Sequence, residues 1–285
     1  MLRLMTFWLA LGFAAAAAAQ PTQPNFDHDA TKPPPPIAVG PERHTELQPF
    51  EARRAVSGEV FEGMGAGPHP AVLFVHWLGD PATTNHTEFE ADARTLAVLG
   101  VTSLLVDAPW SRKGWFGPLG ASADADIRAS EDEVVDLRRS LDLLLGQPGV
   151  DRTRVAYVGH DFGAMFGMML ASVDARPSRY VFMTPNSSVG EWYLWEKKTP
   201  DRDTYLARLS MFDLGNFAPK VRAKGVLFQF SRRDEYVTRE HAQAIYDATP
   251  DPKTLQWFDA DHGLAADDAR LARIAWLEQA LGVGR

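Results

Sequence analysis

From about residue 55 onward, the chain alternates between short apolar runs and longer amphipathic segments. Continuous apolar runs of this length are typical of buried strands, which we expect at 71–75, 101–106, 155–158, 180–183, 226–230 and 255–258. Apolar positions at helical spacing predict helices at 89–99, 132–145, 163–173, 239–248 and 265–281. Apolar strands separated by helices predict an α/β fold with a mostly parallel central sheet covered on both faces.

The N-terminal fifty residues have a different character. Residues 1–20 carry one early Arg3, an apolar stretch and then an alanine tract with small-residue cleavage sites, which predicts a secretory signal peptide. The apolar stretch is shorter than the roughly 20 residues that span a bilayer, so we expect an exported protein, periplasmic or secreted, with no stable membrane insertion after cleavage. Residues 21–50 are proline-rich and predict a linker or surface arm. The domain is expected over 51–285, with an antiparallel edge strand near 55–61 and a short cap near 190–224.

Composition narrows the possible partners. A chain of 285 residues with 45% apolar and 23% charged residues favours one globular domain. The net charge of -8, without clusters of Lys or Arg, argues against nucleic acid and leaves a small-molecule substrate as the expected partner. The absence of cysteine removes thiol nucleophiles, and the eight histidines lack metal-ligand spacing, so neither a metal nor a cofactor is expected. The oligomeric state is left open.

The most informative motif is Gly159-His160-Asp161-Phe162-Gly163, which lies between a predicted strand and a predicted helix. A nucleophile flanked by glycines at such a turn is typical of a nucleophile elbow. Here the position of the nucleophile holds Asp161, which needs no neighbouring base because a carboxylate is already ionised at neutral pH. The pattern therefore predicts chemistry through a carboxylate.

Two later strand ends supply the rest of a predicted triad. Asp234 follows the strand at 226–230, and His262 follows the strand at 255–258. This chain order of nucleophile, acid and histidine is typical of elbow hydrolases, in which the acid orients the histidine base. Glu235, Asp259 and Asp261 are alternatives to Asp234 as the orienting acid.

The strand at 71–75 leads into His76-Trp77-Leu78-Gly79, which predicts an oxyanion hole. In elbow hydrolases one backbone N–H comes from this loop and the other from the residue after the nucleophile. We therefore expect Trp77 and Phe162 as donors. His76 is expected to fix the loop rather than to carry protons.

With these motifs in place, the chain resembles the α/β-hydrolase fold superfamily over residues 55–285, closest to its dienelactone-hydrolase-like members. The segments that carry the resemblance are His76–Gly79, Gly159–Gly163, Asp234–Val237 and His262. Dienelactone hydrolases use a cysteine nucleophile. The elbow is instead similar to that of epoxide hydrolases and haloalkane dehalogenases, in which an aspartate attacks carbon.

The resemblance implies a hydrolase of small organic substrates, and three functions stay open. Asp161 can attack an alkyl carbon and form an ester that His262 and Asp234 then hydrolyse, as epoxide hydrolases do. Alternatively, the same residues hydrolyse esters or lactones without an alkyl intermediate, or the chain is a non-catalytic binding protein on this scaffold. Candidate substrate-binding residues are His76, His160, Trp110, Trp192, Tyr193 and Tyr205.

Overall fold

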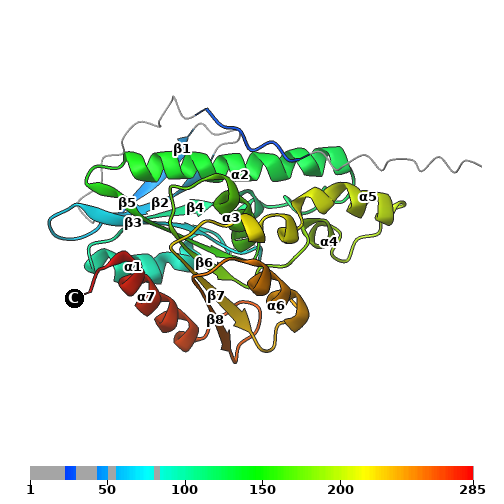
Figure 1. The fold of residues 1–285 in the computed structure, drawn as a ribbon. Helices are drawn as coiled ribbons and strands as arrows, with labels where there is room; N and C mark the ends of the chain where they lie inside the picture. Colours follow the sequence, from blue (N-terminus) through cyan, green and yellow to red (C-terminus); the bar gives the residue numbers. More distant parts are fainter. Residues whose placement is uncertain (1–22, 30–43, 51–55, 80–83, 285) are drawn as a thin grey trace, which may run out of the picture.

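In the computed structural model, residues 23–29, 44–50, 56–79 and 84–284 are described. They form one sheet of eight strands in the order β1-β2-β4-β3-β5-β6-β7-β8 (Figure 1). β1 and β2 run antiparallel to their neighbours, and all other pairs are parallel. The mostly parallel sheet predicted from the apolar runs is confirmed. The strands are β1 His44–Phe50, β2 Val56–Phe61, β3 His69–Val75, β4 Thr102–Asp107, β5 Val150–His160, β6 Arg179–Met183, β7 Gly225–Ser231 and β8 Lys253–Phe258.

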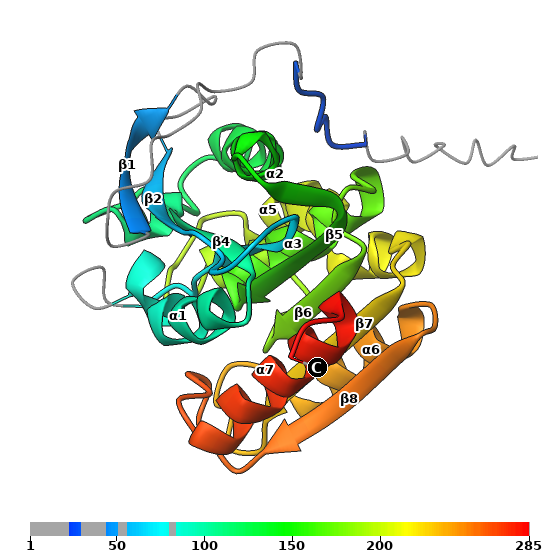
Figure 2. The same cartoon turned by 90° about the vertical axis from the view of Figure 1, so that its left-hand side faces the viewer.

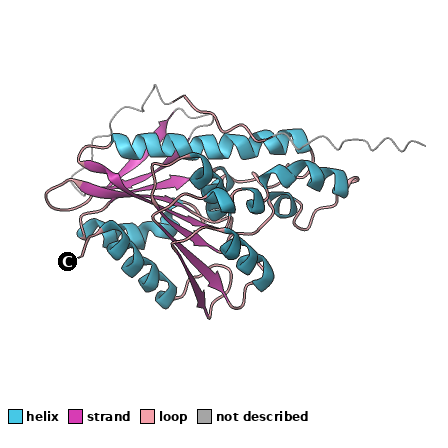
Figure 3. Cartoon of the chain, in the orientation of Figure 1, coloured by secondary structure: helices cyan, strands magenta, loops and turns pink. Residues whose placement is uncertain are grey.

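Helices cover both faces of the sheet (Figures 2 and 3). α1 (Glu90–Val98) and α7 (Asp267–Leu281) lie on one face, where they share a core with side chains of β3 to β7. α2 (Ala123–Gly146), α3 (Phe162–Val173) and α6 (Arg239–Ala248) enclose a larger core on the other face. All five predicted helices are present, although α2 begins at Ala123 rather than at residue 132.

The segment between β6 and β7 forms the predicted short cap. It contains α4 (Val189–Tyr193), α5 (Arg202–Leu209) and three turns of 3-10 helix, at Ser210–Phe212, Leu214–Asn216 and Ala218–Lys220. Buried hydrogen bonds join it to α2: the Tyr205 hydroxyl donates to Asp126 over 2.7 Å, and the Tyr193 hydroxyl lies 3.0 Å from that of Ser130. The cap is therefore docked on the domain by its own tyrosines.

The N-terminal region differs in part from the expected arm. Strand β1 lies within 21–50, so the sheet begins before residue 51, and β2 is an inner strand rather than the edge. Phe26 is buried against Phe212 and Phe217 of the cap, which makes 23–29 a packed arm. The predicted signal peptide lies outside the described residues. Within the described ranges, no helix is long and apolar enough to cross a bilayer.

Candidate active site

Asp161 occupies a strained turn between β5 and α3, with φ of 52° and ψ of -112°. Non-glycine residues rarely adopt positive φ, and such residues cluster at functional sites. The flanking glycines make the turn possible: a Cβ on Gly159 would lie 2.3 Å from the Gly163 carbonyl oxygen, and one on Gly163 would lie 2.2 Å from that of Val75. The sequence thus folds here into the predicted elbow.

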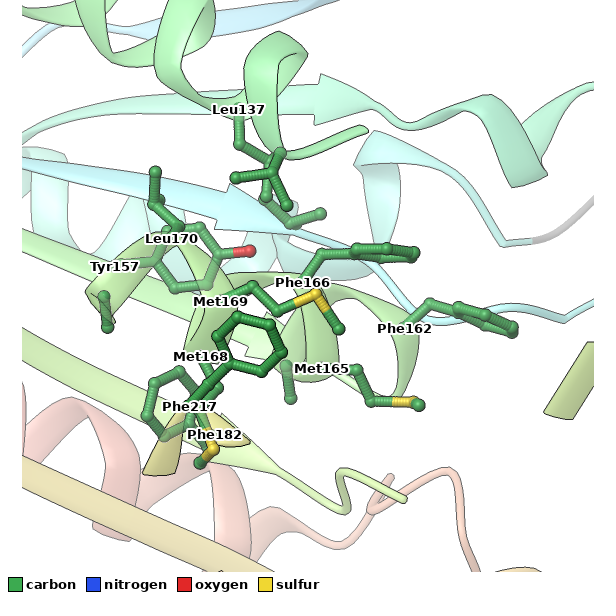
Figure 4. Packing of buried hydrophobic residues seen from close by; sticks show 14 of the residues in the cluster. Leu137, Tyr157, Phe162, Met165, Phe166, Met168, Met169, Leu170, Phe182 and Phe217 are labelled. Atoms are coloured by element: carbon green, nitrogen blue, oxygen red, sulfur yellow. The ribbon is translucent and has the colours of Figure 1, made fainter. Parts of the chain in front are cut away.

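Packing behind the elbow holds it in place. Phe162, Met165, Phe166 and Met169 project from α3 into the larger core (Figure 4). The Tyr157 hydroxyl donates to the Gly163 carbonyl over 2.6 Å within this core. A buried hydrogen bond at the first turn of α3 fixes the helix against β5, and with it the direction of the Asp161 side chain.

The Asp161 carboxylate has one held oxygen and one free oxygen. Oδ2 accepts a hydrogen bond from the Leu78 amide over 3.2 Å. Oδ1 is buried, has no hydrogen-bond partner within the described residues, and lies 3.8 Å from Nε2 of His262, which is also buried without a partner. Buried polar atoms are nearly always hydrogen-bonded, so two unpartnered atoms facing each other mark a site for a reacting group.

Asp234 is the acid that contacts His262. Nδ1 of His262 lies 3.0 Å and 2.9 Å from the two carboxylate oxygens of Asp234. The amides of Tyr236 and Val237 donate to Asp234 and fix the carboxylate. Asp259, one of the alternative orienting acids, instead pairs with Arg233 at the surface. The structure thus brings Asp161, His262 and Asp234 together in the predicted order.

These contacts determine the charge of the imidazole. Burial disfavours the charged form of His262, but the nearby carboxylates of Asp161 and Asp234 outweigh it and raise its pKa to about 10. Burial also disfavours the charged form of Asp234, which by itself would raise the pKa of this carboxyl. The hydrogen bond and charge of His262 outweigh burial and leave that pKa below its ordinary value. At neutral pH the resting site therefore holds an imidazolium between two carboxylates.

The predicted loop donor is wrong by one residue. The Trp77 amide donates to Oε2 of Glu88 over 2.9 Å, whereas the Leu78 amide is the one that faces Asp161. Phe162 is the first residue of α3, so its amide has no partner within the helix. His76 fixes the loop as expected, because Nδ1–H donates to the Trp77 carbonyl and Nε2 accepts from the Ala108 amide.

Most of the candidate substrate-binding residues have their polar groups engaged elsewhere. His76 and His160 are bound within the protein, the Trp110 indole donates to the His76 carbonyl, and the hydroxyls of Tyr193 and Tyr205 contact α2. Trp192 is the exception. Its indole Nε1 is buried without a hydrogen-bond partner within the described residues. Its ring lies 6.1 Å from that of His262 and 6.0 Å from that of Phe162.

Two residues at the site were not predicted. Tyr236 contacts the ring of His262 edge-on at 4.9 Å, and its position two residues after Asp234 was the only signal in the sequence. Glu88 bonds both Trp77 and His160, and no motif pointed to it. A cavity of about 500 Å³ borders Trp77, Glu88, Tyr236 and His262 on the α1–α7 side.

The described part of the chain contains no group of three His, Cys, Asp or Glu residues suited to a metal ion. Asp161 and His262 expose only 2% and 3% of their side chains. What the arrangement offers is therefore a sheltered carboxylate, an imidazole held by a second carboxylate, and two backbone amides. Such a set can form and hydrolyse an acyl or alkyl ester.

The sequence matches no protein-family model and no curated protein. Solved structures with a similar fold include 2,6-dihydroxy-pseudo-oxynicotine hydrolase, at 17% identity and a TM-score of 0.62 over 85% of this chain and 68% of that one. An acetyl xylan esterase from Paenibacillus sp. R4 is 17% identical with a TM-score of 0.62, over 84% and 89% of the two chains. The alpha/beta hydrolase GrgF from Penicillium sp. sh18 is 14% identical with a TM-score of 0.61, over 84% and 99%. These likenesses show that the chain has the α/β-hydrolase fold.

Proposed function

We propose that this protein is a hydrolase of small organic substrates in which Asp161 attacks an alkyl carbon, as in epoxide hydrolases. The observation that carries the proposal is that the two oxygens of the Asp161 carboxylate have different surroundings. Oδ2 is held by the Leu78 amide, and Oδ1 is unpartnered and 3.8 Å from His262. An attacking oxygen needs a free lone pair, and the oxygen that becomes the ester carbonyl needs a donor.

The reaction proceeds in two steps. In the first, a lone pair of Oδ1 forms a bond to carbon while the carbon–oxygen or carbon–halogen bond breaks and the leaving group takes the electron pair. An epoxide oxygen that leaves in this way is protonated by the His262 imidazolium. In the second step, His262 removes a proton from water, which attacks the ester carbon of Asp161. Negative charge develops on Oδ2 beside the amides of Leu78 and Phe162. The alcohol departs with the proton that His262 took from water, and the regenerated Asp161 carboxyl then returns a proton to the imidazole.

Loss of the Asp161 charge sets the order of the two steps. Before attack, that charge helps to keep His262 protonated and unable to act as a base. Once Asp161 is an ester, the imidazole faces a single carboxylate and its pKa falls. His262 gives its proton to the epoxide oxygen or, after a halide has left, to solvent, and the neutral imidazole can then accept a proton from water. The substrate thereby turns on the base that completes its hydrolysis.

The unpartnered Trp192 indole supports a substrate whose leaving group accepts a hydrogen bond. The rings of Trp77, Trp192 and Tyr236, all within 6.1 Å of His262, favour an uncharged, largely apolar molecule. Tyr193 and Tyr205 are bound to α2, so a pair of cap tyrosines as donors to an epoxide oxygen is not part of the proposal.

A second candidate is hydrolysis of esters or lactones, in which His262 activates water directly and Asp161 is not alkylated. The presence of two acetyl xylan esterases among the similar structures favours it. Labelling separates the two. After many turnovers in water enriched in heavy oxygen, alkyl attack leaves the label in the Asp161 carboxylate, because water attacks the ester of Asp161 itself. Direct attack of water on the substrate leaves Asp161 unlabelled.

The substrates for this test are p-nitrophenyl esters, styrene oxide and bromoalkanes. With the bromoalkanes, whose leaving group needs no proton, the variant His262→Gln should accumulate an adduct on Asp161 that is detectable by mass, because the second step lacks its base. An unlabelled Asp161 together with turnover of the esters would establish the second candidate. Silence on all three classes, with ligand binding unchanged in Asp161→Asn, would leave a binding protein.

A further inference from the structure

A buried ion pair lies beneath the three loops that form the site. Glu88 belongs to the 3-10 turn His86–Phe89, and His160 is the last residue of β5. Nδ1 of His160 lies 2.7 Å from Oε1 of Glu88, with the histidine side chain fully buried and the glutamate 16% exposed. Neither residue contacts the free oxygen of Asp161, and the two-step reaction above does not use them.

The outer ends of the pair reach two further loops. Nε2 of His160 lies 3.0 Å from the backbone carbonyl of His262, and Oε2 of Glu88 accepts from the Trp77 amide. Both partners of His160 are acceptors, so both of its ring nitrogens satisfy their contacts only as N–H donors, that is, as the imidazolium. Burial raises the pKa of Glu88, but the charge and hydrogen bond of His160 outweigh it and lower that pKa, so the carboxylate remains ionised.

Each residue that the ion pair contacts either belongs to the proposed active site or is next to a residue of that site in the chain. His160 precedes Asp161, Trp77 precedes Leu78, and the carbonyl belongs to His262 itself. The Trp77 ring also stacks on that of His160, with centroids 5.5 Å apart and planes 22° apart. One pair of charges thus joins the elbow, the oxyanion loop and the histidine loop, which come from distant parts of the chain.

We propose that Glu88 and His160 are positioning residues, which hold the Leu78 amide and the His262 ring in place relative to Asp161. The kinetic part of this inference rests on the proposed function, and the positional part does not. Glu88 borders the cavity, but neither residue contacts the free oxygen of Asp161 or Nε2 of His262. Loss of the pair should therefore change the chemical step more than substrate binding. A misplacement of about 1 Å among reacting groups lowers rates by roughly 100-fold.

The test uses the variant Glu88→Gln in the full chain. Glutamine keeps the shape and an oxygen for the Trp77 amide, but it removes the charge that His160 requires. The matched control is Glu90→Gln, two residues along, because Glu90 pairs with the exposed Arg94 of α1 and not with His160. The first readout is nitrogen NMR of the histidine rings, with the amide signal of Leu78, and it needs no substrate.

In the wild type and in Glu90→Gln, we expect both ring nitrogens of His160 to carry protons. In Glu88→Gln, His160 should lose the Nδ1 proton, and the signals of His262 and of the Leu78 amide should move. With whichever of p-nitrophenyl acetate, styrene oxide or bromobutane is turned over, kcat should fall about 100-fold and KM should change less than about threefold. His262 and Leu78 signals identical to those of the wild type would overturn the proposal.

If Glu88→Gln does not fold, the double variant Glu88→Gln/His160→Gln removes both charges and keeps a donor for the His262 carbonyl. It should fold and have a higher kcat than the single variant His160→Gln, since the two residues act as a unit. Full wild-type kcat in the double variant would overturn the proposal. Failure of the proposed function is distinguishable, because an unlabelled Asp161 changes neither the His160 signals nor the expected movement of His262.

Discussion

The variant Asp161→Asn tests the electrostatic coupling at the centre of the site. Asparagine removes one negative charge and tolerates positive φ, so the elbow should still form. The charge lies 3.8 Å from Nε2 of His262, and at an effective dielectric constant of about 20 its attraction for the imidazolium is about 4 kcal/mol. That energy corresponds to a factor of roughly a thousand in the acid dissociation constant of His262.

We therefore expect the pKa of His262 to fall from about 10 in the wild type to near neutrality in Asp161→Asn. The assay is an NMR titration of the imidazole in both proteins. Asp259→Asn is the control, because this exposed carboxylate pairs with Arg233 and should leave the His262 titration unchanged. A titration of His262 in Asp161→Asn that matches the wild type would refute this coupling. It would also refute the proposal that alkylation of Asp161 allows His262 to act as a base.

The same coupling predicts how stability depends on pH. The pKa of folded His262 lies above its ordinary value of 6.5, so binding of the proton stabilises the fold. This contribution is complete below about pH 6.5 and is lost as the pH rises through about 10. Denaturant unfolding should show wild-type stability decreasing over that window, with a smaller decrease in Asp161→Asn. Equal slopes in the two proteins would contradict the assignment.

Three further substitutions probe the site and its support. Trp192→Phe removes the unpartnered indole N–H and should lower kcat about 100-fold, whereas Trp195→Phe, on a side chain 39% exposed, should not; equal rates in the two would exclude the indole as a donor. Gly163→Ala forces a Cβ to within 2.2 Å of a backbone carbonyl, so thermal unfolding should show a loss on the order of 3 kcal/mol. Gly215→Ala, which meets nothing within 4 Å, is its control. Phe26→Ala should cost about 3 kcal/mol in denaturant unfolding, and an unchanged midpoint would mean that the arm contributes nothing.

The sequence predicted most of the sheet because strands buried on both faces are continuous apolar runs, a signal that depends only on neighbouring residues. Strand β1 lacked that signal, since its letters HTELQPF are mostly polar. Asp161, Asp234 and His262 were found because each follows a strand in a fixed order, and parallel strands end at one edge of the sheet.

What the sequence could not give are contacts that depend on the direction of single atoms. Trp77 and Leu78 are adjacent, and only the path of the loop decides which amide faces Asp161. Glu88 meets His160 across 72 positions of the chain, with no spacing rule to join them. The sequence favoured packing of the cap tyrosines over a role as donors to substrate, but only the positions of their partners in α2 could decide between the two.

The backbone angle at Asp161 has a consequence for how this protein tolerates change. Glycine adopts positive φ without steric cost, whereas Asp161 holds this conformation under strain. The backbone strain at this position is therefore the cost of presenting a carboxylate to the substrate, and the pairing with His262 offsets part of it. Substitutions meant to stabilise the protein are better placed in the arm and the cap, where added packing leaves the Asp161 carboxylate unchanged.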